Sequence, residues 1–145
     1  MTLDHANLDA YDQAILDVLS RQGRISMTEL AGRVGLSKTP VIARVKRLES
    51  EGVITGYRAE LSAHKLGLGH IAFVEVRMSD TREPSLQAFN EAVRQIPEVE
   101  ACHLIAGGFD YLLKVRTRDI RQYRNVLGER ISRLPGVAAT STYVS

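Results

Sequence analysis

The sequence has 145 residues, a hydrophobic fraction of 44% and a formal net charge of +2, which suits one ordinary domain or two small ones with packed cores. It contains no signal-peptide pattern and no apolar run near the roughly 18 residues that cross a bilayer, so we expect a cytoplasmic protein without a membrane partner. The single cysteine, Cys102, excludes an intramolecular disulfide and a zinc site built from paired cysteines, and we expect no metal or resident cofactor.

The first fifty residues predict three short helices. Apolar residues recur at helical spacing between Leu8 and Leu19 and predict the first helix, with Asp9 as its N-cap and Gly23 at its C-terminal end. The capping-box sequence "SMTE" opens a second helix, which ends at Gly35. "GLS" then forms a tight turn in which Ser37 is expected to cap a third helix over residues 38–50. A short glycine turn between the last two helices is typical of a helix-turn-helix.

The third helix carries a local excess of positive charge on the face opposite its core stripe. Val41, Val45 and Leu48 form the stripe, and small and basic residues cover the rest of the helix. Small side chains allow close approach to base edges in a major groove, and cations can neutralise phosphates. The alternative is a solvated face on an ordinary three-helix cluster, which the turn chemistry disfavours. The predicted contacts to double-stranded DNA are Ser37, Lys38, Thr39, Pro40, Ile42, Ala43, Arg44, Lys46 and Arg47.

The segment after the third helix predicts the boundary between two domains. "VITGYRAEL" at 53–61 alternates like a strand and is expected to form a small wing, and "SAHKLGLG" at 62–69 has the composition of a linker. We therefore expect a winged helix-turn-helix DNA-binding domain at 1–61, a linker at 62–69 and a second domain at 70–145, for which the family resemblance described below implies effector binding and oligomerisation.

The second half predicts four strands and two helices in the order βαββαβ, which is the split βαβ, ferredoxin-like arrangement. The whole chain is therefore expected to belong to the α+β class. Ile71 and Phe73 are apolar on one face of the first strand, and Ala72 and Val74 are apolar on the other. Two helices cover only one face of such a sheet, so the uncovered apolar face argues for self-association.

Several stretches of the chain resemble a known family. "QGRISMTELAGRVGLSKTPVIARVKRLESEGVITGY", "CHLIAGGFDYLLKVRT" and "LPGVAATSTYV" are similar, in this order, to the Lrp/AsnC family of bacterial and archaeal transcription regulators. The resemblance covers nearly the whole chain. It implies a winged helix-turn-helix, a ferredoxin-like sensing domain, homodimers that often assemble into octamers, and an amino-acid effector bound between sensing domains. Relatives usually carry a further short segment after the last strand, whereas this sequence ends at Ser145.

The resemblance also implies an effector site around the glycine pair. Backbone N–H groups of Gly107 and Gly108 are accessible to an α-carboxylate, Asp110 to an α-ammonium and Tyr111 to a side chain. His103 is expected at an interface or near the effector, and Thr140 and Thr142 of the last strand are implied to lie close by. The alternative is a glycine-rich hairpin whose aspartate makes a local turn bond. Similarity to regulators of amino-acid catabolism, including proline degradation, makes proline or leucine the expected effector.

Two other functions are weighed against an amino-acid-responsive regulator. One is an architectural protein that organises DNA without an effector. The other is a ferredoxin-like small-molecule-binding protein or enzyme, for which the sequence offers no metal cluster or phosphate loop. Cys102 and His103 are neighbours on a predicted strand, so their side chains point to opposite faces and cannot act as a nucleophile and base pair. We therefore expect no enzymatic activity.

Overall fold

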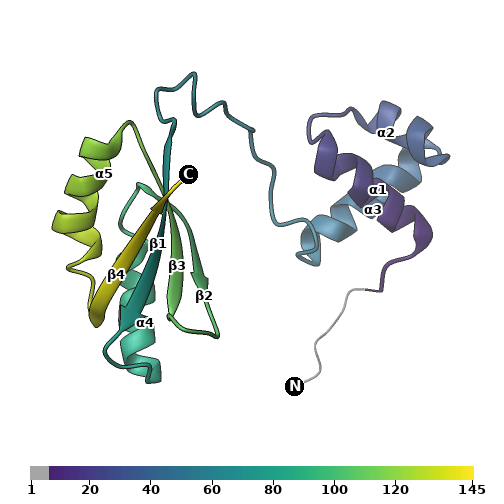
Figure 1. The fold of residues 1–145 in the computed structure, drawn as a ribbon. Helices are drawn as coiled ribbons and strands as arrows, with labels where there is room; N and C mark the ends of the chain where they lie inside the picture. Colours follow the sequence, from purple (N-terminus) through teal and green to yellow (C-terminus); the bar gives the residue numbers. More distant parts are fainter. Residues whose placement is uncertain (1–6) are drawn as a thin grey trace. The chain divides into compact units, whose positions relative to one another are not determined.

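The computed structural model describes residues 7–145, which form two compact units (Figure 1). One unit ends at Glu60 and the other runs from Leu61 to Ser145. Within residues 7–145, no helix combines the length and the apolar character needed to cross a bilayer.

The first unit contains α1 (Ala10–Arg21), α2 (Met27–Val34) and α3 (Lys38–Ser50). The side chain of Asp9 caps α1, as predicted, by accepting a hydrogen bond from the backbone N–H of Asp12 at 2.8 Å. Gly35 ends α2 in the left-handed conformation, with a φ of 75°, which glycine adopts without a steric penalty. The predicted core stripe of α3 is confirmed by burial, and it packs with residues of α1 and α2 in a core that includes Ile15, Leu30, Val41, Val45 and Leu48.

The structure corrects two details of the sequence-based expectation. The strand expected over 53–61 does not form. The backbone N–H groups of Val53 and Ile54 instead donate to the carbonyl of Leu48 at 2.9 and 3.0 Å, which closes the end of α3. A strand needs a neighbouring strand for its backbone hydrogen bonds, and no strand is present among residues 7–60. Ser37 occupies the N-cap position of α3, but its side chain makes no capping hydrogen bond.

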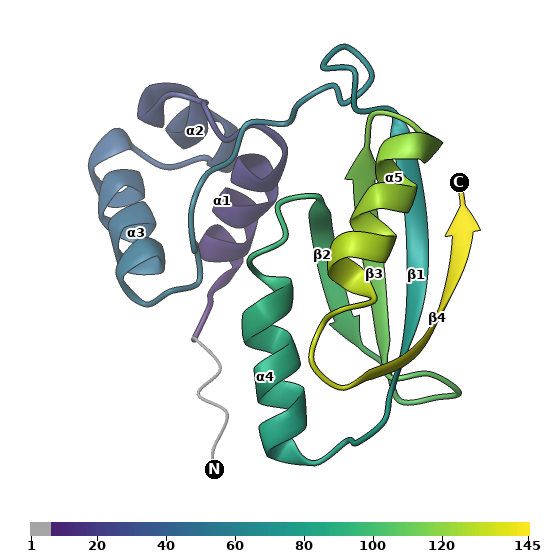
Figure 2. The same ribbon diagram turned by 90° about the vertical axis from the view of Figure 1, so that its left-hand side faces the viewer.

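The second unit is a four-stranded antiparallel sheet with helices on one face. Its elements are β1 (His70–Met78), α4 (Glu83–Val93), β2 (Val99–Leu104), β3 (Tyr111–Thr117), α5 (Ile120–Val126), a π-helical turn η1 (Leu127–Ile131) and β4 (Val137–Val144). The strand order is β2-β3-β1-β4, so β2 and β4 are the two edges. Figure 2 shows α4 and α5 side by side on the same face of the sheet.

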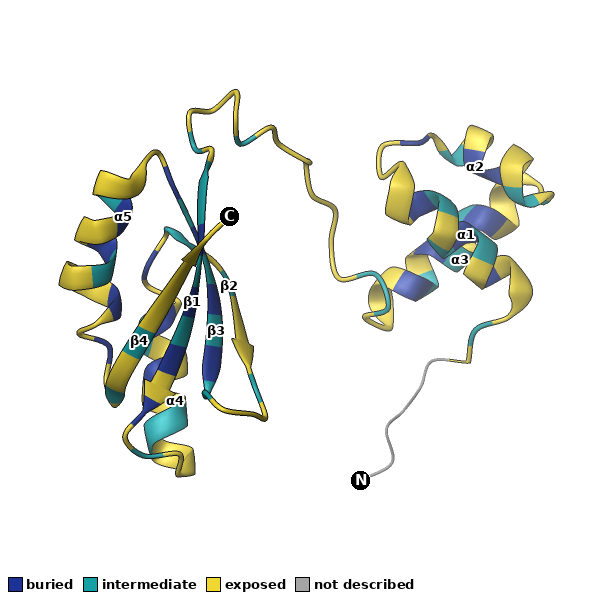
Figure 3. Ribbon diagram, viewed as in Figure 1, coloured by how far each residue is buried: buried dark blue, intermediate teal, exposed yellow. Residues whose placement is uncertain are grey.

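Strand alternation separates the covered face from the open face. Along β1 and β3, buried residues, dark blue in Figure 3, alternate with more accessible ones. The open face carries a cross-strand aromatic pair, Phe73 on β1 opposite Tyr143 on β4, and Phe73 also lies opposite Lys114 on β3. Tyr143 is 56% exposed. The predicted uncovered face is therefore present, and it combines apolar and charged side chains.

Candidate DNA-binding surface and effector site

A compact turn positions α3 after α2. The left-handed Gly35 reverses the chain, the backbone N–H of Leu36 donates to the carbonyl of Ala31 at 3.1 Å, and the side chain of Leu36 packs against the helical core. This geometry fixes one face of α3 inward and leaves the other accessible. Among the predicted DNA contacts, those exposed in the structure are Ser37, Lys38, Thr39, Pro40, Ala43 and Lys46, and Ile42 is half-buried.

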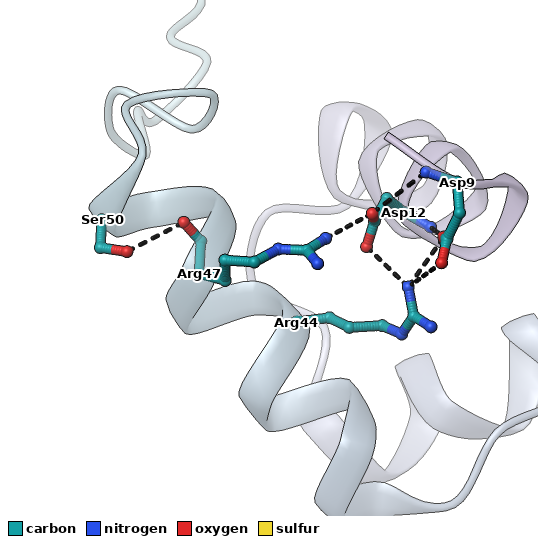
Figure 4. Close-up of polar contacts among 5 residues, drawn as sticks. All are labelled: Asp9, Asp12, Arg44, Arg47 and Ser50. Carbon is teal, nitrogen blue, oxygen red and sulfur yellow. Dashed lines mark hydrogen bonds and ion pairs between the residues drawn. The ribbon is translucent and has the colours of Figure 1, made fainter. Parts of the chain in front are cut away.

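The two arginines of α3 lie away from this exposed face and reach the N-terminus of α1 (Figure 4). Nη1 of Arg44 donates to both carboxylate oxygens of Asp9, at 2.7 and 2.6 Å, and to Oδ1 of Asp12 at 2.9 Å. Nη2 of Arg47 donates to Oδ2 of Asp12. Only 1% of the Asp12 side chain is exposed, so this carboxylate is a buried charge held by two guanidinium groups.

Electrostatics around this cluster follow from the same contacts. The hydrogen bond from Arg44 holds the pKa of Asp9 below its ordinary value, and the hydrogen bond to Asp9 raises the pKa of Arg44. The guanidinium carbon of Arg44 also lies 5.4 Å from the ring centroid of Tyr11, within the range of a cation–π interaction. Arg44 is therefore fixed by contacts within its own domain.

Asp12 is the residue of this cluster that sequence reasoning missed. Its position contained a signal, because residues 12, 15, 16 and 19 form one helical stripe and the other three are apolar. A carboxylate in an apolar stripe requires a partner of opposite charge when it is buried. The nearest cations in the fold are on α3, which the sequence pattern of α1 alone does not identify.

The glycine loop connects β2 to β3 and is held by backbone and side-chain hydrogen bonds. The N–H of Ile105 donates to the carbonyl of Asp110 at 2.8 Å, and the N–H of Asp110 donates to the carbonyl of Val76 at 2.9 Å. Oδ2 of Asp110 accepts from the backbone N–H of Met78 at 2.7 Å. The side chain of Asp110 therefore joins the loop to the end of β1, 32 residues away in the sequence, and this is not the local turn bond of the alternative raised from the sequence.

The chain itself gives no reason for glycine at 107 or 108. Neither residue has a positive φ. A Cβ atom at Gly108 would meet no heavy atom within 4 Å, and one at Gly107 would lie 3.6 Å from the Ile105 side chain, an ordinary contact. The structure therefore shows no packing or backbone requirement for glycine at either position.

Two hollows flank the loop. One, of about 450 Å³, combines an apolar wall with glycine backbone and the carboxylate of Asp110. Its lining is Thr81, Leu86, Leu104, Ile105, Ala106, Gly107 and Asp110. The second, of about 230 Å³, lies toward β4 and is lined by Glu75, Arg77, Phe109, Ala139, Thr140 and Ser141. Apolar surface beside a carboxylate suits the side chain and ammonium of an amino acid.

Tyr111 does not line either hollow. Only 2% of it is exposed, its ring stacks on Phe89 with centroids 4.2 Å apart, and its hydroxyl donates to Oδ1 of Asn90 at 2.9 Å. Burial raises the pKa of its phenol. The side chain of Tyr111 therefore belongs to the core under α4, and its predicted contact with an effector stays a prediction.

The remaining predicted effector residues lie at opposite edges of the sheet. His103 is exposed on β2, whereas Thr140 and Thr142 are on β4. Thr140 lines the smaller hollow beside Phe109, and the hydroxyl of Thr142 is hydrogen-bonded to the hydroxyl of Tyr123. One chain thus brings Gly107, Gly108 and Asp110 together but does not bring His103 to Thr140. Among residues 7–145, no group of three or more His, Cys, Asp or Glu side chains is placed to hold a metal ion.

Comparisons with known proteins assign both units. Residues 8–55 match the winged helix-turn-helix DNA-binding domain, and residues 71–145 match the Lrp/AsnC ligand binding domain. The two matches define a DNA-binding transcriptional regulator with a ligand-binding domain. The chain is 62% identical over 138 residues to the proline dehydrogenase transcriptional activator of Rhizobium radiobacter, covering 95% of this chain and 88% of that protein. The chain belongs to the Lrp/AsnC family of transcriptional regulators.

A second relative and a solved structure place the chain within this family. It is 48% identical over 138 residues to the leucine-responsive regulatory protein of Klebsiella pneumoniae, covering 95% of this chain and 84% of that protein. The crystal structure of a transcriptional regulator from Neisseria meningitidis in complex with L-Met superimposes with a TM-score of 0.89 at 33% identity, covering 95% and 89% of the two chains. The predicted family and α+β fold class are confirmed.

Proposed function

We propose that this regulator controls proline catabolism. We further propose that an amino acid, with proline as the first candidate, changes the assembly of the regulator or the affinity of the regulator for DNA. The observation that supports this proposal is a difference in sequence identity over 138 residues. The chain is 62% identical to a proline dehydrogenase transcriptional activator and 48% identical to a leucine-responsive regulatory protein. A regulator of this kind works where the chromosome is, in the bacterial cytoplasm. Catalysis is not part of the proposal, because Cys102 and His103 are consecutive residues of β2 and point to opposite faces.

The proposed DNA-reading surface is the exposed face of α3 within residues 1–61. Thr39 and Ala43 are small enough to approach base edges, and Lys38 and Lys46 carry charge to the phosphates. Ser37, Pro40 and Ile42 complete the contact at the start of the helix. Residues 62–69 connect this surface to the sensing domain at 70–145.

The proposed effector site is the glycine loop and the hollows beside it. N–H groups at Gly107 and Gly108 bind the carboxylate, and the oxygen of Asp110 that is not bonded to Met78 receives the ammonium. The L-Met complex of a regulator with the same fold supports an amino acid as the ligand class. Because His103 and the β4 threonines lie at opposite sheet edges, we propose that a second copy completes the site.

Thermal unfolding against each of the twenty amino acids tests the proposed effector. A ligand at 100 times its dissociation constant stabilises by about 2.7 kcal/mol per site, so the midpoint is expected to rise by several degrees with proline. Asp110→Ala is expected to abolish the rise, and Asp119→Ala, which removes the N-cap of α5, is expected to keep it. A midpoint that no amino acid raises would instead support a DNA-organising protein without an effector.

The open face of the sheet is the proposed dimer interface, from which octamers assemble. Phe73→Asp places a charge in the centre of this face, opposite Tyr143 and Lys114, and is expected to give monomers in sedimentation equilibrium. Ile120→Asp is the control, because Ile120 is 43% exposed at the first turn of α5, where a carboxylate is tolerated. Dimers that survive Phe73→Asp at micromolar concentration would place the interface elsewhere.

A further inference from the structure

We propose that Arg44 and Arg47 are positioning residues, which hold α3 against α1 through Asp12, and that the phosphate contacts of α3 are made by Lys38 and Lys46. The inference rests on the proposed DNA-binding surface and assigns separate tasks to the four cations of this helix. It reverses the expectation from charge alone, which treats all four as phosphate ligands.

The contacts of Asp12 make it the centre of a clamp between the two helices. Its Oδ1 accepts from Arg44 at 2.9 Å, and its Oδ2 accepts from Arg47 and from the backbone N–H of Asp9 at 3.2 Å. Asp9 contributes a second carboxylate to Arg44 at 2.6 Å. The same atoms therefore cap the start of α1 and fix the middle of α3, as Figure 4 shows.

Burial makes this clamp difficult to exchange for a phosphate. Asp12 is 1% exposed, so moving either arginine to DNA would leave a buried carboxylate with one of its partners missing, which is strongly unfavourable. Nε of Arg47 is also shielded from solvent, so the inner edge of its guanidinium is out of reach of a ligand.

The two lysines of α3 differ from the two arginines in exposure and in ion pairing. Lys38 and Lys46 are exposed, and neither forms an ion pair within residues 7–145. At 100° per residue, Arg44 and Arg47 lie roughly 100° around the helix from the face of Thr39, Ala43 and Lys46. The clamp therefore flanks the reading face and sets its orientation.

Asp12→Asn distinguishes two roles for Arg44 and Arg47. They either position α3 through Asp12, or they bind phosphates and are only restrained by Asp12 in the absence of DNA. The assay is fluorescence anisotropy at several salt concentrations, with two labelled duplexes: one selected from a random pool by the wild-type protein and one of mixed sequence. With the clamp, Asp12→Asn is expected to lower affinity for the selected duplex at least tenfold with an unchanged salt slope. Asp17→Asn is the matched control, because Asp17 pairs with Arg21 on the surface of α1 at 3.2 Å, and it is expected to bind like wild type.

The opposite outcome is equally specific. If Asp12 only restrained two phosphate ligands, Asp12→Asn would tighten binding to both duplexes and steepen the salt slope by about 0.9 for each freed arginine, and the proposal would be overturned. A wild-type protein that binds neither duplex at low salt would remove the proposed DNA-binding function itself, together with this inference.

A second variant decides the question if Asp12→Asn does not fold. Arg47→Met retains the apolar stem and leaves Asp12 paired with Arg44. We expect its salt slope to equal that of wild type while its thermal midpoint falls, whereas Lys46→Met is expected to flatten the slope by about 0.9 at an unchanged midpoint. Equal flattening in both variants would assign Arg47 to the phosphates and contradict the clamp.

Discussion

Replacing Tyr111 by alanine is expected to lower the free energy of unfolding by about 4 kcal/mol. The ring is 2% exposed and stacks on Phe89 at 4.2 Å between centroids, so its removal leaves a cavity between β3 and α4. The loss has two parts. The folded state loses the transfer free energy gained by burying a large side chain, and Phe89 loses its aromatic partner. Urea unfolding followed by circular dichroism measures this difference directly.

Tyr111→Phe separates the core role of this residue from a role in effector binding. It removes only the hydrogen bond to Asn90 at 2.9 Å, so stability is expected to fall by about 1 kcal/mol. The rise of the midpoint with an amino acid is expected to persist, because the phenol lies in the core under α4. An effector response that vanishes in Tyr111→Phe while the fold is retained would show that Tyr111 contacts the ligand after all.

Replacing Lys46 by glutamate is expected to weaken DNA binding at least tenfold at moderate salt. The substitution removes one charge-assisted contact, about 1.5 to 3 kcal/mol, and places a carboxylate beside the phosphates. Lys46 is exposed on α3, so the substitution is not expected to disturb the fold and the thermal midpoint is expected to stay constant. Anisotropy titrations at a series of salt concentrations give both the affinity and the slope.

Arg133→Glu provides the matched control, because it makes the same change of two charges in the sensing domain, on a side chain that is 70% exposed. Its affinity for DNA is expected to stay within about twofold of wild type, since the proposed phosphate contacts are made by lysines of α3 and not by Arg133. If Arg133→Glu and Lys46→Glu weakened binding equally, the effect would come from net charge and α3 would lose its assigned role.

Local periodicity was sufficient to predict the helices, the four strands of the sheet and the fold class. The apolar stripe of Val41, Val45 and Leu48 is buried as predicted, and the glycine at position 35 ends α2 in the left-handed conformation. The strand predicted over 53–61 failed because alternation describes a side-chain pattern, whereas a strand also requires a backbone partner. In this segment the N–H groups of Val53 and Ile54 close the end of α3 instead.

The candidate site was harder to predict because side-chain partners come from distant parts of the sequence. Arg44 and Arg47 resemble phosphate ligands on a helical projection, and only the fold brings Asp12 to them from 32 and 35 residues away. Tyr111 could have been assigned to the core, because it alternates with Leu113 and Val115 on β3. The role of the glycine pair stays a prediction, since nothing inside the chain requires glycine at position 107 or 108.

The most direct test of an amino-acid-responsive regulator of proline catabolism is a titration of the protein onto the promoter of its own host's proline dehydrogenase gene. A labelled promoter duplex and a scrambled duplex of equal length are compared by anisotropy, with and without proline. We predict binding to the promoter at least tenfold tighter than to the scrambled duplex, and a change of about 5- to 150-fold in that affinity when proline is added. Equal affinity for the two duplexes, unaltered by proline, would contradict the proposed function.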